Sequence, residues 1–185
     1  MILWRALIDT PVGVMRALAS DQALCAFEFH DEGRMARLDR RLARWLPGIE
    51  LRDGDHPILA QTRAWAEAYF RGDSADTSRL PLDARGAPFE QRVWAALRDI
   101  PPGTTTSYGA IARTLGDAGA SRAVGMANGA NPIAIVVPCH RVIGANGSLT
   151  GYGGGLDRKV WLIEHERRHW SAAPAATGRL PFDAP

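Results

Sequence analysis

A thiol, an imidazole and a guanidinium stand side by side at Cys139, His140 and Arg141. The preceding residues, 133–137, are apolar and mostly β-branched, which predicts a strand buried on both faces. Pro138 ends that strand, because proline has no N–H to give to a sheet. Reactive groups at the end of a rigid strand are placed accurately, so this segment is a candidate nucleophilic site. Most free cysteines are only small core residues, so the interpretation depends on the rest of the chain.

The composition is that of an ordinary globular protein with one or two domains: 185 residues, 46% hydrophobic and 23% charged. We find no apolar run of membrane-spanning length and expect no signal peptide, so the predicted location is the cytoplasm. Cys25 and Cys139 are then expected to be reduced thiols. The formal net charge of +2 permits contact with nucleic acid but is too small to argue for it.

The first half of the chain predicts a small antiparallel sheet with helices. Apolar-rich strands are expected at 3–8, 14–19 and 23–29, separated by turn residues. Helices are expected from about 32 to 46 and from 57 to 70. Residues 72–87 are rich in Asp, Ser, Pro and Gly. We therefore predict a scaffold domain over 1–82 and a linker over 83–87.

The second half predicts a mostly helical domain over 88–170. After a helix at 88–100, short helices at 108–115 and 121–128 flank a four-residue turn with glycine, which matches a helix-turn-helix. That signal is weak alone, because helical hairpins are common. The second short helix has small side chains except Arg122, which fits close approach to a ligand or tight helix packing. A glycine-rich loop at 144–155, a helix from 156 to 169 and a flexible tail at 171–185 complete the chain.

Several ordered motifs accompany the segment 138–141: Ser107-Tyr108, Ser121 to Gly125, Ala130-Asn131-Pro132, Gly151-Tyr152 and Lys159 to Glu166. With them the chain resembles the O6-alkylguanine-DNA alkyltransferases, also called methylated-DNA–protein-cysteine methyltransferases. It is most similar to the bacterial constitutive members with a single function. The resemblance covers Pro88 to about Glu166 and, more weakly, the N-terminal part. It implies an α+β fold: an N-terminal sheet with helices, ribonuclease H-like, then a helical domain with a helix-turn-helix.

The activity implied by the resemblance is DNA repair by direct, stoichiometric and irreversible transfer of an alkyl group to Cys139. The donor is O6-alkylguanine, and also O4-alkylthymine, in double-stranded DNA, with the damaged base flipped out of the helix. The product is a thioether, which water cannot reopen, so no cofactor is implied. We expect a monomer, and cooperative binding along DNA stays open.

Site roles follow from the resemblance. Cys139 is the acceptor, His140 the base that takes its proton through a water, and Glu166 the carboxylate that orients His140. Arg122 fills the gap left by the flipped base, and Tyr108 assists flipping and supplies a proton near guanine N3. Asn131 is expected to brace the turn before the reactive segment, and Lys159 to support the site electrostatically. The expected DNA contacts are Ser121, Ala123, Gly125, Ala127, Asn128 and Arg141. The expected pocket wall consists of Pro138, Val142, Tyr152 and Gly153.

Two departures from the family bear on the site. Some relatives carry a hydroxyl side chain at the Gly153 position, so its absence predicts a roomier pocket. Some relatives bind zinc in the N-terminal domain, but the full ligand set is missing here, and we predict no metal. The rival functions are a lesion-binding protein without transfer, which would lack Cys139, a Cys-His hydrolase of another fold, and a sensor with an added regulatory domain.

Overall fold

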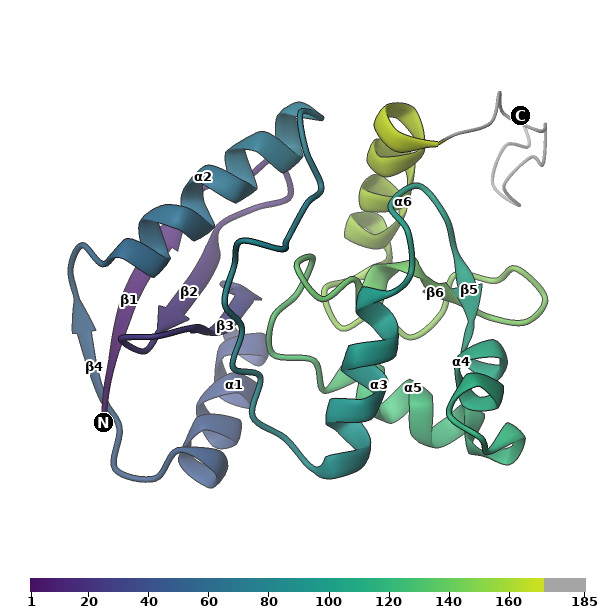
Figure 1. Cartoon of the computed structure of the whole chain (residues 1–185), viewed down its shortest axis with the longest axis horizontal. Coiled ribbons are helices and arrows are strands. Elements are labelled where there is room, and N and C mark those ends of the chain that lie inside the picture. The colour runs from purple at the N-terminus through teal and green to yellow at the C-terminus, as the bar shows by residue number, and fades with distance from the viewer. Residues whose placement is uncertain (172–185) are drawn as a thin grey trace.

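The computed structural model of the protein describes residues 1–171, so all of the predicted flexible tail except Ser171 lies outside the described part. A sheet with two helices forms one side of the molecule, and the remaining helices and the loops between them form the other (Figure 1). The extended segment 72–87 connects the two sides. Within residues 1–171 no helix has the length and apolar character needed to cross a membrane.

The sheet has the strand order β3-β2-β1-β4, with β1 at Ile2–Ile8, β2 at Met15–Ala19, β3 at Leu24–Phe29 and β4 at Glu50–Asp53. The pairs β1–β2 and β2–β3 are antiparallel, which confirms the three predicted strands. Strand β4 runs parallel to β1 and was not predicted. Its sequence, Glu-Leu-Arg-Asp, lies at the sheet edge and lacks the alternation of a half-buried strand.

Helices α1 (Glu32–Trp45) and α2 (Pro57–Arg71) cover opposite faces of this sheet. Alternate side chains of the strands point to opposite faces. Leu18 of β2 packs with Leu38 of α1, while Met15 and Phe27 share the core cluster that includes Tyr69 of α2. The cluster with Met15, Phe27 and Tyr69 also includes side chains of the helices after residue 88, so the two halves of the chain share one core.

The second half contains α3 (Pro88–Arg98), α4 (Tyr108–Thr114), α5 (Ser121–Gly129) and α6 (Leu156–Trp170), all close to their predicted ranges. Ser107 caps α4 as expected, because its hydroxyl accepts a bond of 3.1 Å from the Ala110 N–H. Helices α4 and α5 pack on each other, and the short 3₁₀ helix η1 (Ala118–Ala120) lies between them. A parallel pair of two-residue strands, β5 (Thr106–Ser107) and β6 (Val142–Ile143), was not predicted.

The predicted strand at 133–137 is wrong. The segment is buried as expected, but it forms a tight turn that makes only isolated bridges, one of them between Ile133 and Phe27. The chain reverses because the Val137 N–H donates to the Ile133 carbonyl at 3.0 Å, and Ile135 takes a left-handed φ of 69°. A run of apolar residues predicts a buried segment, but burial alone does not distinguish a strand from a buried turn.

Candidate active site

Cys139 and His140 lie on a 3₁₀ helix, η2 (Cys139–Arg141), which follows the buried turn. Both side chains are buried. Successive side chains of a 3₁₀ helix diverge by about 120°, so the thiol and the imidazole point in different directions. The turn is held by Asn131, whose side chain donates to the Val137 carbonyl at 2.8 Å and accepts from the Ile133 N–H at 3.0 Å. Asn131 therefore occupies the bracing position expected for it.

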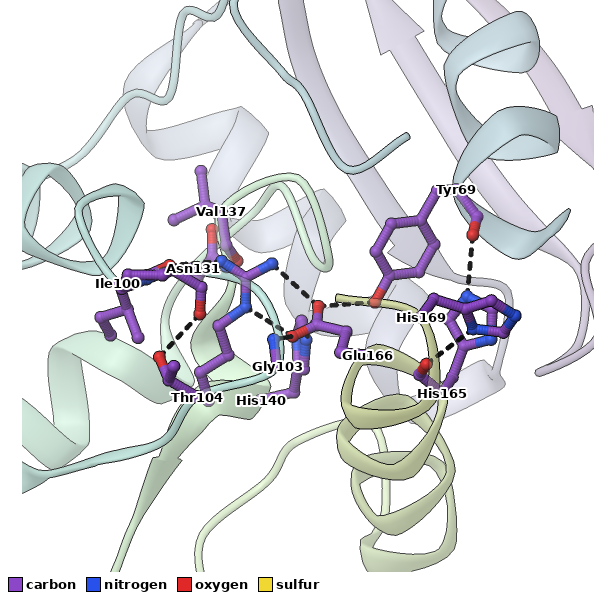
Figure 2. Close-up of polar contacts among 12 residues, drawn as sticks. Tyr69, Ile100, Gly103, Thr104, Asn131, Val137, His140, His165, Glu166 and His169 are labelled. Carbon is purple, nitrogen blue, oxygen red and sulfur yellow. Dashed lines mark hydrogen bonds and ion pairs between the residues drawn. The ribbon is translucent and has the colours of Figure 1, made fainter. Parts of the chain in front are cut away.

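Glu166 of α6 is the carboxylate that His140 contacts (Figure 2), with 2.8 Å between His140 Nε2 and Glu166 Oε1. Arg141 donates from Nε to Oε2 and from Nη2 to Oε1, both at 2.8 Å. The Tyr69 hydroxyl donates to Oε1 at 2.7 Å, and the Gly103 N–H donates to Oε2 at 3.1 Å. Burial alone would raise the pKa of Glu166, but the charges and hydrogen bonds of His140 and Arg141 outweigh it and hold that pKa well below its usual range.

His140 is therefore a neutral base with one free nitrogen. Burial lowers the pKa of His140, although the nearby Glu166 carboxylate acts in the opposite direction. A neutral imidazole that gives its Nε2–H to Glu166 keeps a lone pair on Nδ1. That Nδ1 atom is buried and has no hydrogen-bond partner among the described residues. It can accept a proton while Glu166 stabilises the resulting imidazolium.

The Cys139 thiol is protonated at rest. Burial raises its pKa from 9.0 to about 11, and the Asn131 hydrogen bond and the charges of Arg34 and Lys159 offset this only in part. A thiolate is the effective nucleophile, so this thiol needs a base at the moment of reaction. His140 is the neighbouring group that can serve.

Three residues predicted to contact DNA are instead structural. Arg141 is buried, and its guanidinium is occupied by Glu166 and by the Ile100 carbonyl, which accepts from Nη1 at 2.5 Å. Asn128 is buried on the inner face of α5, where its Nδ2 donates to the Cys139 carbonyl at 3.3 Å. Ala127 is buried too, with its carbonyl bonded to a tryptophan indole N–H. The prediction took all positions of α5 as one surface and did not separate its two faces.

The outer face of α5 carries Arg122 and Ala123, which are exposed as predicted. Met126 lies on the same face with 73% of its surface exposed, and the sequence reasoning missed it. Ser121 and Gly125 are half-buried. Gly125 faces the Tyr108 ring, whose Cδ1 would be in ordinary contact, at 3.8 Å, with a Cβ there. A helical spacing of three to four residues from Arg122 could have identified Met126.

The glycine-rich loop is fastened to the site through Lys159 and Tyr108. Lys159 is buried and donates from Nζ to the Val142 carbonyl at 2.6 Å and to the Thr150 carbonyl at 2.9 Å. The Tyr108 hydroxyl also donates to the Thr150 carbonyl, at 3.1 Å. Burial lowers the pKa of Lys159 from 10.5 to about 8. Lys159 thus holds β6 and the loop together.

The expected pocket wall is formed in part. Tyr152 is buried, with its ring edge-on to Phe29 at a centroid distance of 6.2 Å. Pro138 and Val142 are also buried. Whether the pocket is roomier at Gly153 stays a prediction; in this structure the Arg34 guanidinium from α1 occupies the space that a Cβ at Gly153 would take.

Two histidines of α6, His165 and His169, lie one helical turn apart, and the sequence reasoning did not consider them. Their rings are engaged with backbone carbonyls: His165 Nε2 contacts the Tyr69 carbonyl at 2.7 Å, and His169 Nδ1 contacts the His165 carbonyl at 2.8 Å (Figure 2). Within residues 1–171 no three His, Cys, Asp or Glu side chains gather in a group that could hold a metal ion.

Comparisons with known proteins agree with the site. The family model described as "6-O-methylguanine DNA methyltransferase, DNA binding domain" matches residues 88–168. A protein of Mycolicibacterium paratuberculosis named methylated-DNA–protein-cysteine methyltransferase is 62% identical, over 94% of this chain and 97% of its own length. A Salmonella typhimurium protein of the same name is 59% identical over 53% of this chain and 57% of its own length.

Solved structures extend the likeness to the fold. The crystal structure of the Mycobacterium tuberculosis O6-methylguanine methyltransferase has a TM-score of 0.76 and 41% identity, and covers 94% of this chain and 96% of that one. The M. tuberculosis protein in complex with DNA has a TM-score of 0.75 and 40% identity, with 95% and 96% covered. The mixed α+β fold is thus shared along nearly the whole chain, and the protein belongs to the methylated-DNA–protein-cysteine methyltransferases.

Proposed function

We propose that this protein repairs DNA by transferring the alkyl group of O6-alkylguanine, and of O4-alkylthymine, directly and irreversibly to its own Cys139. The observation that carries the proposal is the buried sequence of thiol, neutral imidazole and ionised carboxylate. His140 is bonded to Glu166 and has an unpartnered Nδ1, and it follows Cys139 in the chain. That arrangement activates a nucleophile.

The reaction balances without a cofactor. His140 Nδ1 takes the Cys139 proton through a water. The sulfur then forms a bond to the alkyl carbon while the bond from that carbon to guanine O6 breaks. The electron pair goes to the guanine ring, which recovers a proton and leaves neutral, with Tyr108 as the donor that the family resemblance implies. Tyr108 then regains a proton from the His140 imidazolium by way of solvent, which closes the proton balance. Because a thioether has no carbonyl for water to attack, each molecule acts once.

The proposed partner is double-stranded DNA, bound by a monomer through α4 and α5 as a helix-turn-helix. Supporting this, the outer face of α5 exposes Arg122 beside the small side chain of Ala123 and the apolar side chain of Met126. Reading of bases in the major groove normally needs several long hydrogen-bonding side chains. With one such side chain, α5 is suited to groove and backbone contact with little sequence preference. The target base is flipped out, and Arg122 fills its place.

The domain division is part of the same proposal. We assign residues 1–82 to a ribonuclease H-like N-terminal domain, 83–87 to a linker and 88–170 to the DNA-binding and alkyl-acceptor domain. The extended course of 72–87 between helices α2 and α3 supports this division.

The direct test is the intact mass of the protein after incubation with a duplex that contains one O6-methylguanine. We expect a gain of one methyl group that maps to Cys139 and is absent from Cys139→Ser. Tight binding of the duplex without a mass change would favour a lesion-binding protein instead. If the duplex is not bound and the mass of the protein does not change, the proposed substrate is refuted.

A further inference from the structure

Arg34 of α1 reaches into the site from the N-terminal half of the chain. Its guanidinium forms an ion pair with Glu28 of β3, and the two side chains are only 12% and 5% exposed. The guanidinium lies over Gly153 so closely that a side chain could be added there only if Arg34 moved. Phe29, next to Glu28 in the chain, packs edge-on to Tyr152 and also lies over Gly154.

The same ion pair acts electrostatically on the reactive thiol. Both Glu28 and Arg34 are among the charged groups that act on the pKa of Cys139, where Glu28 raises it and Arg34 lowers it. Both also act on the pKa of the Tyr152 phenol. Arg34 thus lies against the expected wall of the alkyl pocket at Gly153 and acts electrostatically on the acceptor thiol.

The fold gains little from placing a guanidinium here. Arg34 Nε and Nη1 are buried, and neither has a hydrogen-bond partner in residues 1–171. Burying unpaired donors costs free energy, so a native structure that keeps them calls for an explanation. The ion pair with Glu28 satisfies only part of the guanidinium, so it does not account for the two unpaired donors.

We propose that Arg34, held in place by Glu28, is a specificity-determining residue that closes the α1 side of the alkyl pocket and selects small alkyl groups. This rests on the proposed function. It also explains how a chain with glycine at position 153 still has a restricted pocket: the side chain that fills the space comes from another part of the fold.

The test compares rates of transfer to Cys139 from two duplexes of the same sequence, one with O6-methylguanine and one with O6-benzylguanine. A difference of one methylene between two substrates in a hydrophobic pocket changes discrimination by about 10- to 200-fold, and benzyl exceeds methyl by far more than that. We therefore expect Arg34→Ala to raise the benzyl-to-methyl rate ratio at least ~10-fold. Glu28→Gln, which weakens the hold on Arg34, should raise it in the same direction. Arg40→Ala is the matched control, because Arg40 is exposed on the same helix.

The outcomes separate the two proposals. If the unaltered protein transfers no methyl group, the proposed function fails. If it does transfer, and Arg34→Ala slows both substrates equally or leaves the ratio unchanged, the specificity role of Arg34 is refuted. A second measurement checks the geometry itself: Gly153→Ala should lower the melting temperature in the unaltered protein and be tolerated in the Arg34→Ala background. Equal losses in both backgrounds would contradict the placement of Arg34.

Discussion

Tyr69 offers a sharp test of the relay, because it joins the N-terminal half of the chain to the carboxylate that orients His140. Its hydroxyl donates at 2.7 Å to Glu166 Oε1, the same oxygen that His140 contacts. Replacing Tyr69 with Phe removes that donor alone. The ring stays, and with it the stacking on Trp65 at a centroid distance of 5.3 Å.

The size of the effect can be worked from these contacts. A hydrogen bond to a charged group contributes about 1.5–3 kcal/mol, and the lower end applies because Arg141 and Gly103 continue to bond Glu166. We expect Tyr69→Phe to lose about 1.5 kcal/mol of stability on this basis. With one donor fewer, Oε1 is a stronger acceptor and stabilises the His140 imidazolium better. If half of that energy acts on the imidazolium, the pKa of His140 rises by about half a unit.

The assay is the single-turnover rate of transfer to Cys139 between pH 5 and 8, together with urea unfolding. Since His140 must be neutral to act as a base, a higher pKa moves the acid limb of the rate profile to higher pH. Thr62→Val is the matched control: it also removes a buried hydroxyl from α2, one that bonds only within that helix, to the Ile58 carbonyl at 2.8 Å. If both variants lose stability and both keep the unaltered pH profile, Tyr69 is a packing residue and our reasoning is wrong.

Three further predictions concern other parts of the site. Lys159→Met leaves the buried Val142 carbonyl without its lysine donor, while the Thr150 carbonyl keeps the Tyr108 hydroxyl, so we expect a loss of about 1–3 kcal/mol in urea unfolding; a loss below about 1 kcal/mol would contradict the fastening role. The lowered pKa of Glu166 stabilises the fold above the unfolded-state value near 4.3 and loses that effect on acidification, so the unaltered protein should lose stability from about pH 5 to 3 more steeply than Glu166→Gln. Arg122→Ala should slow transfer from duplex DNA at least ~10-fold, since flipping costs a few kcal/mol, and leave transfer from the free O6-alkylguanine base unchanged; equal slowing of both would exclude a role in flipping.

The sequence predicted secondary structure correctly where it depends on residues close together in the chain, such as a helical pattern of apolar residues or an N-cap. Helices α1 and α6 carry clear helical patterns, and Ser107 caps α4 where the residue type suggested. The apolar run at 133–137 correctly predicted a buried segment, but the prediction that this segment is a strand was wrong. Asn131 explains the failure: its side chain bonds both Ile133 and Val137, so a single amide replaces the neighbouring strand that this segment would otherwise need.

At the site, the sequence predicted the reacting groups and missed the groups that hold them. His140 and Glu166 are in contact as the family resemblance implied. Arg141 was predicted on DNA, because a motif gives residue order but not direction, and the 3₁₀ helix turns its guanidinium inward to Glu166. The Gly103 N–H carries no side-chain signal at all, and it reaches Glu166 only because the loop after α3 lies beside α6.

The N-terminal half had no assigned role in the sequence, and the structure gives it contacts on two sides of Cys139. Through α2 it supplies Tyr69 to the carboxylate behind His140, and through α1 it supplies Arg34 to the wall at Gly153. Both side chains belong to elements whose helical pattern is explained fully by packing, so no local signal separates them from core or surface residues. Only the shared core, which brings β3 against the turn at Ile133, places them there. The N-terminal half, through α1 and α2, therefore acts on both the basicity and the selectivity that we propose for the acceptor site.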